Sequence, residues 1–203
     1  MEISRLEQQM QFLIEIDKVK SVFRQNLLAD GSRRENDAEH SWHMAMMVII
    51  LSEYFEGLDV LKTLKIVLIH DIVEIYAGDT FAYDEKAHLD KEYREKMSAE
   101  KIFALLPLEQ EAEYTGLWQE FERMDSNESL CAAIVDRIQP LTLNICTEGM
   151  MWHKNEVTVE KVLKRNKIVF DNAPEIISNY VHKIIAEASE KQYFYRDEEK
   201  NDD

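Results

Sequence analysis

Side chains that can bind metal ions interrupt three apolar stretches of this 203-residue chain. His70 and Asp71 lie within LKIVLIHDIVEIY, Asp136 lies within SLCAAIVDRIQPL, and His40 begins a further apolar stretch. Burying an ionised carboxylate among apolar residues is costly unless a partner compensates its charge. A divalent cation held by two imidazoles and two carboxylates compensates it, and this ligand set suits Mn, Fe, Co, Ni or Zn, with Mg as a further possibility. These four residues are therefore the candidate ligands of one divalent metal ion.

The spacing of these residues favours a catalytic metal site. Neighbouring residues on a helix point about 100° apart, so His70 and Asp71 can share an ion only if it lies beside their helix and other helices close the site. Four protein ligands on an octahedral ion leave two positions for water or a substrate oxygen. Glu74 follows His70 by one turn on the same face, and Asp79 follows Gly78 just beyond the expected helix end. We expect Glu74 to reach a water at the ion and Asp79 to lie at the mouth of the site.

Each candidate ligand also has a simpler interpretation. Taken alone, His40 could cap a helix or lie on the surface, and Asp136 could form an ion pair with a basic neighbour. The pair His70-Asp71 could be a coincidence. The order H…HD…D over three apolar stretches is much harder to explain by chance, and it favours the metal site.

Few turn-forming residues and a helical spacing of apolar residues predict an all-α fold. Gly and Pro together number 8 of 203 residues, about 4% against an average near 12%, which disfavours a β-sandwich or barrel. Apolar residues recur at helical intervals, a turn-rich loop covers 26–37, and Asp37 is the expected N-cap of the second helix. The expected helices cover 3–23, 37–55, 60–76, 84–106, 108–124, 127–149, 157–170 and 174–189, with Pro140 kinking or splitting the sixth.

The chain is long and apolar enough, at 45% hydrophobic residues, to form one compact domain without disulfides or a structural metal. Its formal net charge of −16 repels polyanions, so neither a long nucleic acid nor a membrane is an expected partner. The sequence shows no secretory signal and no apolar window of 18 residues, so we expect a cytoplasmic protein. We expect the domain to end near residue 190 and residues 191–203, which include RDEEKNDD, to form a charged, disordered tail.

Three segments, ENDAEHSWHMAM, LIHDIVEIYAGDT and VDRIQPL, resemble the HD-domain metal-dependent phosphohydrolases, a family named for its His-Asp pair. Within that family they resemble the 5'-deoxynucleotidase branch, over roughly residues 6–184. The resemblance implies a single-domain helical HD bundle within residues 1–190, a metal-binding core at about 20–145, and a homodimer. It assigns metal binding to the four candidate ligands and catalytic roles to Glu74 and Asp79, of which Asp79 contacts substrate.

The same resemblance indicates how the substrate is held. In that branch an Arg-Trp pair ahead of the first ligand binds phosphate and helps to exclude a ribose 2'-hydroxyl. The matching stretch here is VFRQ, so Arg24 fits and Gln25 stands in place of the tryptophan, which leaves the selection of deoxyribose open. The loop GSRREND also brings Arg33 and Arg34 close to His40, where either guanidinium could hold a phosphate through paired hydrogen bonds. A solvated loop is an equally good interpretation of Arg33.

These features predict a small-molecule nucleotide substrate and a hydrolytic reaction. The leading hypothesis is a 5'-nucleotidase that releases phosphate from ribo- or deoxyribonucleoside 5'-monophosphates, with Glu74 orienting or deprotonating the attacking water and arginines neutralising the phosphate oxygens. A second hypothesis is hydrolysis of another phosphate ester, such as a nucleoside triphosphate, a phosphodiester or a sugar phosphate. A third is a non-catalytic, metal-bound nucleotide sensor, in which loss of Glu74 would leave ligand affinity unchanged.

Overall fold

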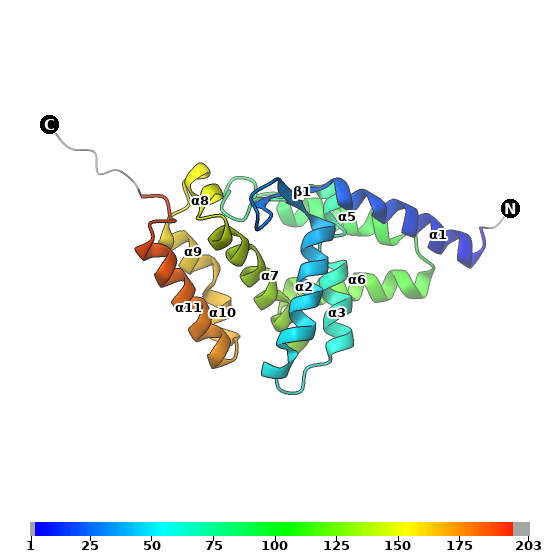
Figure 1. Cartoon of the computed structure of the whole chain (residues 1–203). Coiled ribbons are helices and arrows are strands. Elements are labelled where there is room, and N and C mark those ends of the chain that lie inside the picture. Colours follow the sequence, from blue (N-terminus) through cyan, green and yellow to red (C-terminus); the bar gives the residue numbers. More distant parts are fainter. Residues whose placement is uncertain (1–2, 197–203) are drawn as a thin grey trace.

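The computed structural model describes residues 3–196, and nearly all of their regular structure is helical (Figure 1). Two short strands, β1 (Phe23–Leu27) and β2 (Arg34–Asn36), accompany the helices, and 3-10 turns cover Ile16–Ser21 and Ser52–Tyr54. The predicted all-α class is confirmed. The helices are α1 (Arg5–Glu15), α2 (Asp37–Leu51), α3 (Val60–Ile69), α4 (Glu74–Ala77), α5 (Lys91–Phe103), α6 (Leu108–Arg123), α7 (Asn127–Cys146), α8 (Met150–Lys154), α9 (Val159–Arg165), α10 (Lys167–Asn172) and α11 (Glu175–Glu190).

Helix α7 is the central element of the fold. It packs against α2, α3 and α6 on one side and against α10 and α11 on the other (Figure 1). Its apolar residues divide between two cores: Ala133 and Val135 join the core built with α2, α3, α5 and α6, whereas Ile134 and Ile138 join the core built with α8 to α11. Asp136 therefore lies on the helix that both cores share. The helix continues through Pro140, so the predicted split at this residue is wrong.

A β-hairpin replaces the end of the predicted first helix and the predicted loop at 26–37. α1 ends at Glu15, and after a 3-10 turn the backbone becomes extended at Val22, where φ is −90° and ψ is 118°. β1 and β2 pair antiparallel, with Phe23 opposite Asn36. The apolar spacing before residue 23 fits a helix and a 3-10 turn equally well, so the prediction was wrong about where the helix ends. The hairpin brings β1 against α7.

The predicted helix at 60–76 is interrupted where the candidate ligands occur. α3 ends at Ile69, residues 70–73 form turns, and α4 begins at Glu74. The bond from the Glu74 amide to the Asp71 carbonyl, at 3.0 Å, has the tighter i to i+3 spacing. Gly78, with a φ of +76°, ends α4 in a conformation that favours glycine. His70 and Asp71 therefore lie on a bend, which relaxes the 100° separation expected on a regular helix.

Other boundaries differ by smaller amounts. α5 begins at Lys91 and not at residue 84, since residues 85–90 form turns. The predicted helix at 157–170 is divided at Asn166 into α9 and α10. α8 was not predicted. The N-cap of α2 is Asn36, whose side chain accepts from the Glu39 amide, so Asp37 is the first helical residue and not the cap. α6 and α11 agree with the predicted ranges to within one residue.

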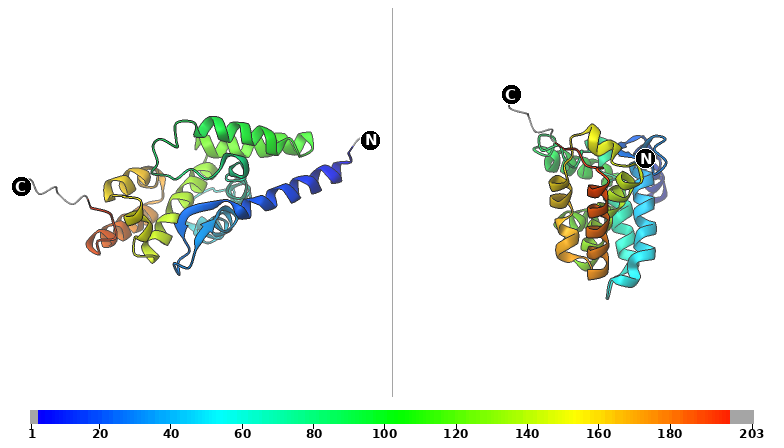
Figure 2. Two further views of the ribbon diagram at one scale, coloured as in Figure 1. Left: turned by 90° about the horizontal axis from the view of Figure 1, so that it is seen from above. Right: turned by 60° about the vertical axis from the view of Figure 1, so that its left-hand side comes forward.

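The C-terminal segment continues the domain beyond the predicted boundary at 190. Phe194 is buried and stacks on Trp152, with ring centroids 4.5 Å apart. The prediction of a disordered tail was therefore wrong for 191–196, and its remainder, 197–203, lies outside the described residues. α1 and α11 lie at opposite ends of the molecule, as Figure 2 shows. No helix within residues 3–196 has both the length and the apolarity that a membrane crossing requires.

Candidate metal centre and active site

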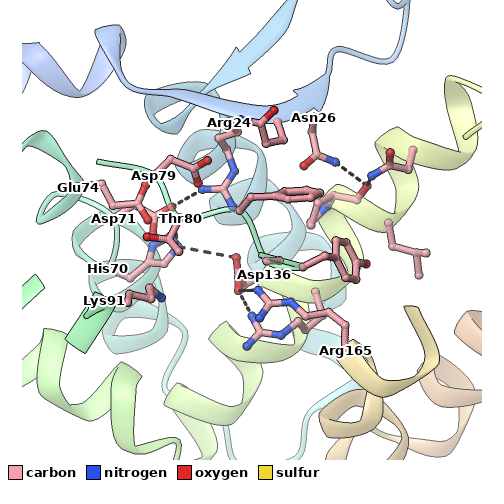
Figure 3. A pocket seen from close by; sticks show the side chains of 18 of the residues that line it. Arg24, Asn26, His70, Asp71, Glu74, Asp79, Thr80, Lys91, Asp136 and Arg165 are labelled. Carbon is pink, nitrogen blue, oxygen red and sulfur yellow. Dashed lines mark hydrogen bonds and ion pairs between the residues drawn. The ribbon is translucent and has the colours of Figure 1, made fainter. Parts of the chain in front are cut away.

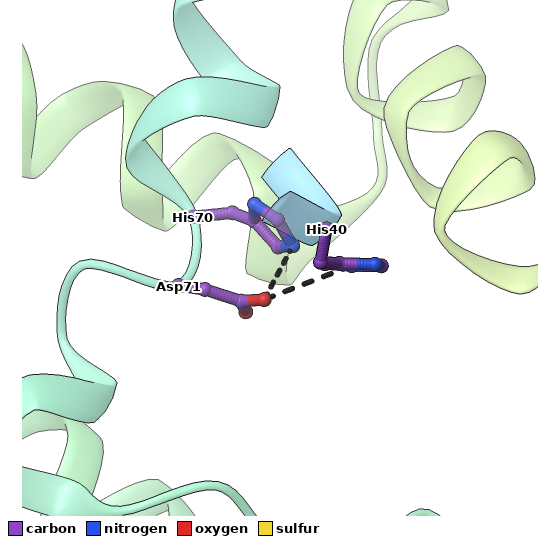
Figure 4. A group of neighbouring side chains, drawn as sticks. All are labelled: His40, His70 and Asp71. Atoms are coloured by element: carbon purple, nitrogen blue, oxygen red, sulfur yellow. Dashed lines mark ion pairs between the residues drawn. The ribbon is translucent and has the colours of Figure 1, made fainter. Parts of the chain in front are cut away.

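The four candidate ligands converge from three elements: α2 carries His40, α7 carries Asp136, and the bend after α3 carries His70 and Asp71. His40 Nε2 lies 3.1 Å from Asp136 Oδ1 and 3.7 Å from Asp71 Oδ2. His70 Nε2 lies 3.1 Å from Asp71 Oδ2 and 4.0 Å from Asp136 Oδ1. Figure 4 shows three of these side chains turned toward one another. Ligand bonds of about 2.1 Å place neighbouring donor atoms about 3 Å apart. His40, His70 and Asp71 each offer a donor atom within 4.8 Å of the other two, so these three could hold one ion, and Asp136 Oδ1 lies beside both imidazoles.

Both imidazoles are oriented for metal binding by a bond on their other nitrogen. His40 Nδ1 donates to Gln139 Oε1 at 2.8 Å, and His70 Nδ1 donates to the Val67 carbonyl at 2.9 Å. These bonds leave the Nε2 lone pair of each ring facing the carboxylates. His70 Nε2 is buried and makes no hydrogen bond, and the Asp71 carboxylate lies 3.1 Å from it. A metal ion between these two groups would satisfy both of them.

A buried hydrogen-bond network, which the sequence analysis missed, supports His40. Gln139 Nε2 donates to Glu35 Oε1 at 2.6 Å while Gln139 Oε1 accepts from His40. Burial raises the pKa of Glu35 to about 7. Gln139 follows the ligand Asp136 by three residues and so shares its helix face. The three-residue spacing from Asp136 could have identified Gln139 from the sequence. Nothing in the sequence linked Glu35 to Gln139.

The protonation states of two ligand candidates suit metal binding. Burial, together with the nearby charge of Arg24, lowers the pKa of His40, which favours the neutral imidazole that coordinates metals. Burial alone would raise the pKa of Asp136, but Arg137 and His40 outweigh it and hold that pKa well below its ordinary value. The carboxylate is therefore ionised and ready to coordinate.

Glu74 lies next to the ligand candidates without belonging to their set. It begins α4, its side chain is buried, and its Oε2 has no hydrogen-bond partner. One oxygen each of Asp37, Asp71 and Glu74 lie within 4.8 Å of one another, so these carboxylates could also hold a cation. Burial, with the charges of Asp71 and Asp37, raises the pKa of Glu74 well above its ordinary value. A raised pKa makes a carboxylate a stronger base in its ionised form.

A cavity opens onto these groups, and Figure 3 shows its polar side chains. Arg24 projects from β1, where its Nη1 donates to Asp71 Oδ2 at 2.8 Å and to Asp37 Oδ1 at 3.2 Å. Away from the metal ligands, the wall combines aromatic rings with side-chain amides. The residues of that wall include Asn26, Phe81, Tyr83, Asn144, Met151, Trp152 and Asn166.

The structure brings most of the predicted site residues together. His70, Asp71 and Asp136 line the cavity with Glu74, Asp79, Arg24 and Gln25, and the fully buried His40 lies behind them. Arg33 and Arg34 do not line this cavity. The exposed Arg33 guanidinium donates to both carboxylate oxygens of Glu39 instead. Their predicted contact with phosphate stays a prediction, and the arrangement gives it no support.

Two arginines that the sequence analysis did not single out do line the cavity. Arg137 Nη1 donates to Asp136 Oδ2, and Arg165 Nη2 lies 3.9 Å from the same oxygen. Arg137 directly follows a candidate ligand, which was a usable sequence signal. Arg165 lies at the end of α9, and its approach to Asp136 depends on how α9 packs, which the local sequence does not reveal.

Residues 16–177 match a family model described as the HD domain. Curated relatives include human 5'-deoxynucleotidase HDDC2, which is 27% identical over 131 residues that cover 64% of this chain and 63% of the relative. The Dictyostelium discoideum protein of the same name is 30% identical over 111 residues, covering 52% of this chain and 58% of the relative. The chain thus spans less than two thirds of the length of these curated relatives.

Solved structures extend the comparison over the whole fold. A crystal structure described as a predicted metal-dependent phosphohydrolase from Magnetospirillum magnetotacticum is 45% identical, with a TM-score of 0.87, covering 95% of this chain and 97% of its own. A conserved hypothetical protein from Pyrococcus furiosus, 24% identical with a TM-score of 0.61, covers 89% of this chain and 99% of its own and shares the fold.

Proposed function

The chain belongs to the HD domain family, and on this premise we propose that it is a divalent-metal-dependent phosphohydrolase that releases phosphate from nucleoside 5'-monophosphates. Two findings support the reaction class: the family match and the 45% identity to a protein described as a predicted metal-dependent phosphohydrolase. The name 5'-deoxynucleotidase, carried by relatives of 24–30% identity, supports the finer assignment to nucleotides.

We assign His40, His70, Asp71 and Asp136 as the ligands of one divalent transition metal ion. The spacing of the donor atoms of His40, His70 and Asp71, and the 3.1 Å between Asp136 Oδ1 and His40 Nε2, support this assignment. When bound, such an ion supplies Lewis acidity and makes a coordinated water more acidic. The mixture of imidazole and carboxylate ligands is compatible with Mn, Fe, Co, Ni or Zn, and less so with Mg.

Glu74 is the proposed proton acceptor. Its unpaired Oε2 is buried beside Asp71, so it can take a proton from a water placed in the cavity next to that ligand. This juxtaposition is the single observation that carries the proposal, because a site that only stored metal would not need an unpaired, unliganded carboxylate there.

Arg24 is the proposed charge partner of the phosphate. It reaches the site from β1 and already contacts the ligand Asp71, so its guanidinium lies where the non-bridging oxygens of a bound phosphate would collect negative charge. Asp79 and Thr80, just after Gly78, line the cavity and are placed to contact the sugar or the phosphate. Gln25 lines it too and provides the candidate contact to the ribose 2' position.

The outer wall of the cavity supports a nucleoside as the leaving group. Phe81, Tyr83 and Trp152 provide aromatic surface, and Asn26 and Asn144 provide amides, within the same cavity as the metal ligands. Stacking and amide hydrogen bonds are the interactions by which proteins hold single bases. A small phosphate ester without a ring could not stack on these aromatic side chains.

The experiment that tests the proposal measures inorganic phosphate release from ribo- and deoxyribonucleoside 5'-monophosphates, with nucleoside triphosphates, a phosphodiester and a sugar phosphate for comparison. The protein is treated with EDTA, and Co, Mn, Zn or Mg is then added back. We expect metal-restored release from the monophosphates. Phosphate release from both ribo- and deoxyribonucleotides would mean that the enzyme does not exclude the ribose 2'-hydroxyl, and we would attribute this to Gln25. Turnover only of another ester would replace the nucleotidase assignment, and binding without turnover would favour the sensor.

The same proposal includes a homodimer in the cytoplasm. Large apolar side chains on α2 and α11 are exposed, among them Trp42 and Ile50 on α2 and Tyr180 on α11. A second copy would cover this surface. Both cysteines are free thiols, as expected in a reducing compartment. Light scattering on the eluting protein should give twice the chain mass, and Ile50→Glu should give the monomer.

A further inference from the structure

Two arginines share one carboxylate oxygen at the edge of the candidate metal centre. Arg137 hydrogen-bonds Asp136 Oδ2, while Arg165 comes from α9 and ends 3.9 Å from the same oxygen, beyond hydrogen-bond distance. Asp136 Oδ1 faces His40 Nε2 at 3.1 Å and is the oxygen assigned to the metal. The single negative charge of the Asp136 carboxylate thus faces two guanidinium groups. This edge of the cavity carries surplus positive charge.

Arg165 has one ion-pair partner among the described residues, Asp136 at 3.9 Å. Within residues 3–196, no hydrogen bond from its side chain meets ordinary distance criteria, and 31% of the side chain remains exposed. Burial, reinforced by Arg137, lowers the pKa of Arg165 to about 10. A guanidinium has five donors in a planar fork that matches a phosphate. Here those donors face a cavity and not a second carboxylate.

The surroundings of the pair favour an anion. Arg137 and Arg165 also line an adjoining surface groove, where Lys86, Lys161 and Lys164 outnumber the acidic Asp84 and Glu85. In a chain of net charge −16, this concentration of positive side chains is local, and it would attract an anionic ligand toward the cavity. Arg33 and Arg34, which the sequence suggested for this role, lie outside the cavity.

We propose that Arg165, with Arg137, binds the phosphate group of the substrate from the α7 and α9 wall of the cavity, facing the contribution of Arg24 from β1. The inference rests on the proposed phosphohydrolase function. Arg137 and Arg165 then form a second set of phosphate contacts, which we call the phosphate clamp. No sequence motif linked α9, which carries Arg165, to the site. The ligand chemistry is a phosphate dianion next to the metal centre, as in a nucleoside 5'-monophosphate or in free inorganic phosphate.

The test compares Arg165→Gln with Arg165→Lys in the metal-loaded protein. Arg5→Gln is the matched control, because Arg5 is an exposed arginine that pairs with Glu109 on another surface. The first readout is the dissociation constant of inorganic phosphate, measured by titration calorimetry at equal metal content. The second is the KM for the best nucleoside 5'-monophosphate.

We expect Arg165→Gln to weaken phosphate binding about 10- to 100-fold, the loss typical of a charge-assisted hydrogen bond. Arg165→Lys should recover part of the affinity, and Arg5→Gln should match the wild type. Unchanged phosphate affinity in a folded, metal-loaded Arg165→Gln protein would overturn the inference, as would a wild type that binds no phosphate.

The binding readout separates this inference from the proposed function. If the wild type hydrolyses no nucleoside monophosphate but binds phosphate through Arg165, the nucleotidase assignment fails and the phosphate clamp stands. If the wild type hydrolyses nucleoside monophosphates and Arg165→Gln does so with unchanged KM and phosphate affinity, the clamp fails and the nucleotidase assignment stands.

Discussion

At the scale of single residues, burial of ionisable groups defines the site. His40, His70 and Asp136 were recognisable from the sequence because polar ligand types in apolar stretches need compensation. In the structure all three are buried, and Asp136 Oδ1 lies 3.1 Å from His40 Nε2 and 4.0 Å from His70 Nε2. Arg165 was not recognisable, because a single arginine near the end of a polar helix looks like any solvated residue. The sequence thus shows where burying a charged side chain would be unfavourable without a partner. It does not show contacts that form only when distant helices pack together.

Glu74→Gln tests the division of labour between metal binding and proton transfer. The amide keeps the shape of the side chain but cannot accept a proton, so we expect kcat to fall about 10²- to 10⁴-fold while bound metal is unchanged. Metal content and phosphate release are measured on the same preparation. Asp71→Asn is the contrasting variant, and it should lose metal as well as activity. A Glu74→Gln protein with wild-type kcat would remove Glu74 from the reaction.

At the scale of elements, the helices with strong apolar periodicity were predictable, and the irregular segments that shape the site were not. α6 and α11 matched because their periodicity is uninterrupted. The hairpin of β1 and β2 and the bend after α3 were missed, since each depends on tertiary contacts that outweigh local preference. These irregular segments carry Arg24, His70 and Asp71 into one cavity. The segments that were hardest to predict are thus the ones that position the candidate site residues.

The junction of α7 and α8 provides a test at this scale. Gly149 has a φ of +73°, and a Cβ there would lie 1.8 Å from the Tyr193 carbonyl oxygen. We expect Gly149→Ala to lower the free energy of unfolding by at least about 3 kcal/mol, through positive-φ strain and displacement of the segment that holds Phe194. Gly57→Ala is the control.

Gly57 has a similar φ of +69°, but a Cβ at this position would meet only open space. Its replacement should cost only about 1–2 kcal/mol, the cost of the backbone conformation. Urea unfolding of both variants gives the comparison. Equal losses in the two variants would show that the close approach to Tyr193 contributes nothing to stability.

At the scale of the whole molecule, an acidic protein encloses a cavity whose carboxylates are accompanied by arginines, two of them from α7 and α9. The net charge of −16 was predictable by counting and argues against polyanionic partners, but it conceals the local placement of Arg24, Arg137 and Arg165. Several carboxylates are buried in the same region, and burial raises the pKa of some of them, such as Glu35 and Glu95, to about 7. Stability should therefore depend on pH.

Glu95 on α5 should make a measurable contribution to the pH dependence of the free energy of unfolding. Burial raises its pKa from an ordinary 4.5 to about 7, although Lys91 lies 3.3 Å away and opposes the shift. Between these two values the unfolded chain releases the proton and the folded chain keeps it, so the stabilisation present below pH 4.5 is lost as the pH rises through 7. For the metal-free protein, we expect Glu95→Gln to flatten this slope.

The expected size of the Glu95 effect is about 1–3 kcal/mol between pH 5 and pH 8, given about 1.4 kcal/mol for each pKa unit. Urea unfolding of the wild type and of Glu95→Gln at both pH values measures it. An identical pH slope in the two proteins would mean that Glu95 is ionised throughout.

The measurement that tests the central claim most directly is a metal titration of EDTA-treated protein, with bound metal and phosphate release from a nucleoside 5'-monophosphate followed on the same samples. The four-residue centre predicts that release rises in proportion to bound metal in the wild type, and that Asp71→Ala neither retains metal nor releases phosphate. Full release by the metal-free wild type, or metal binding and activity in Asp71→Ala, would contradict it.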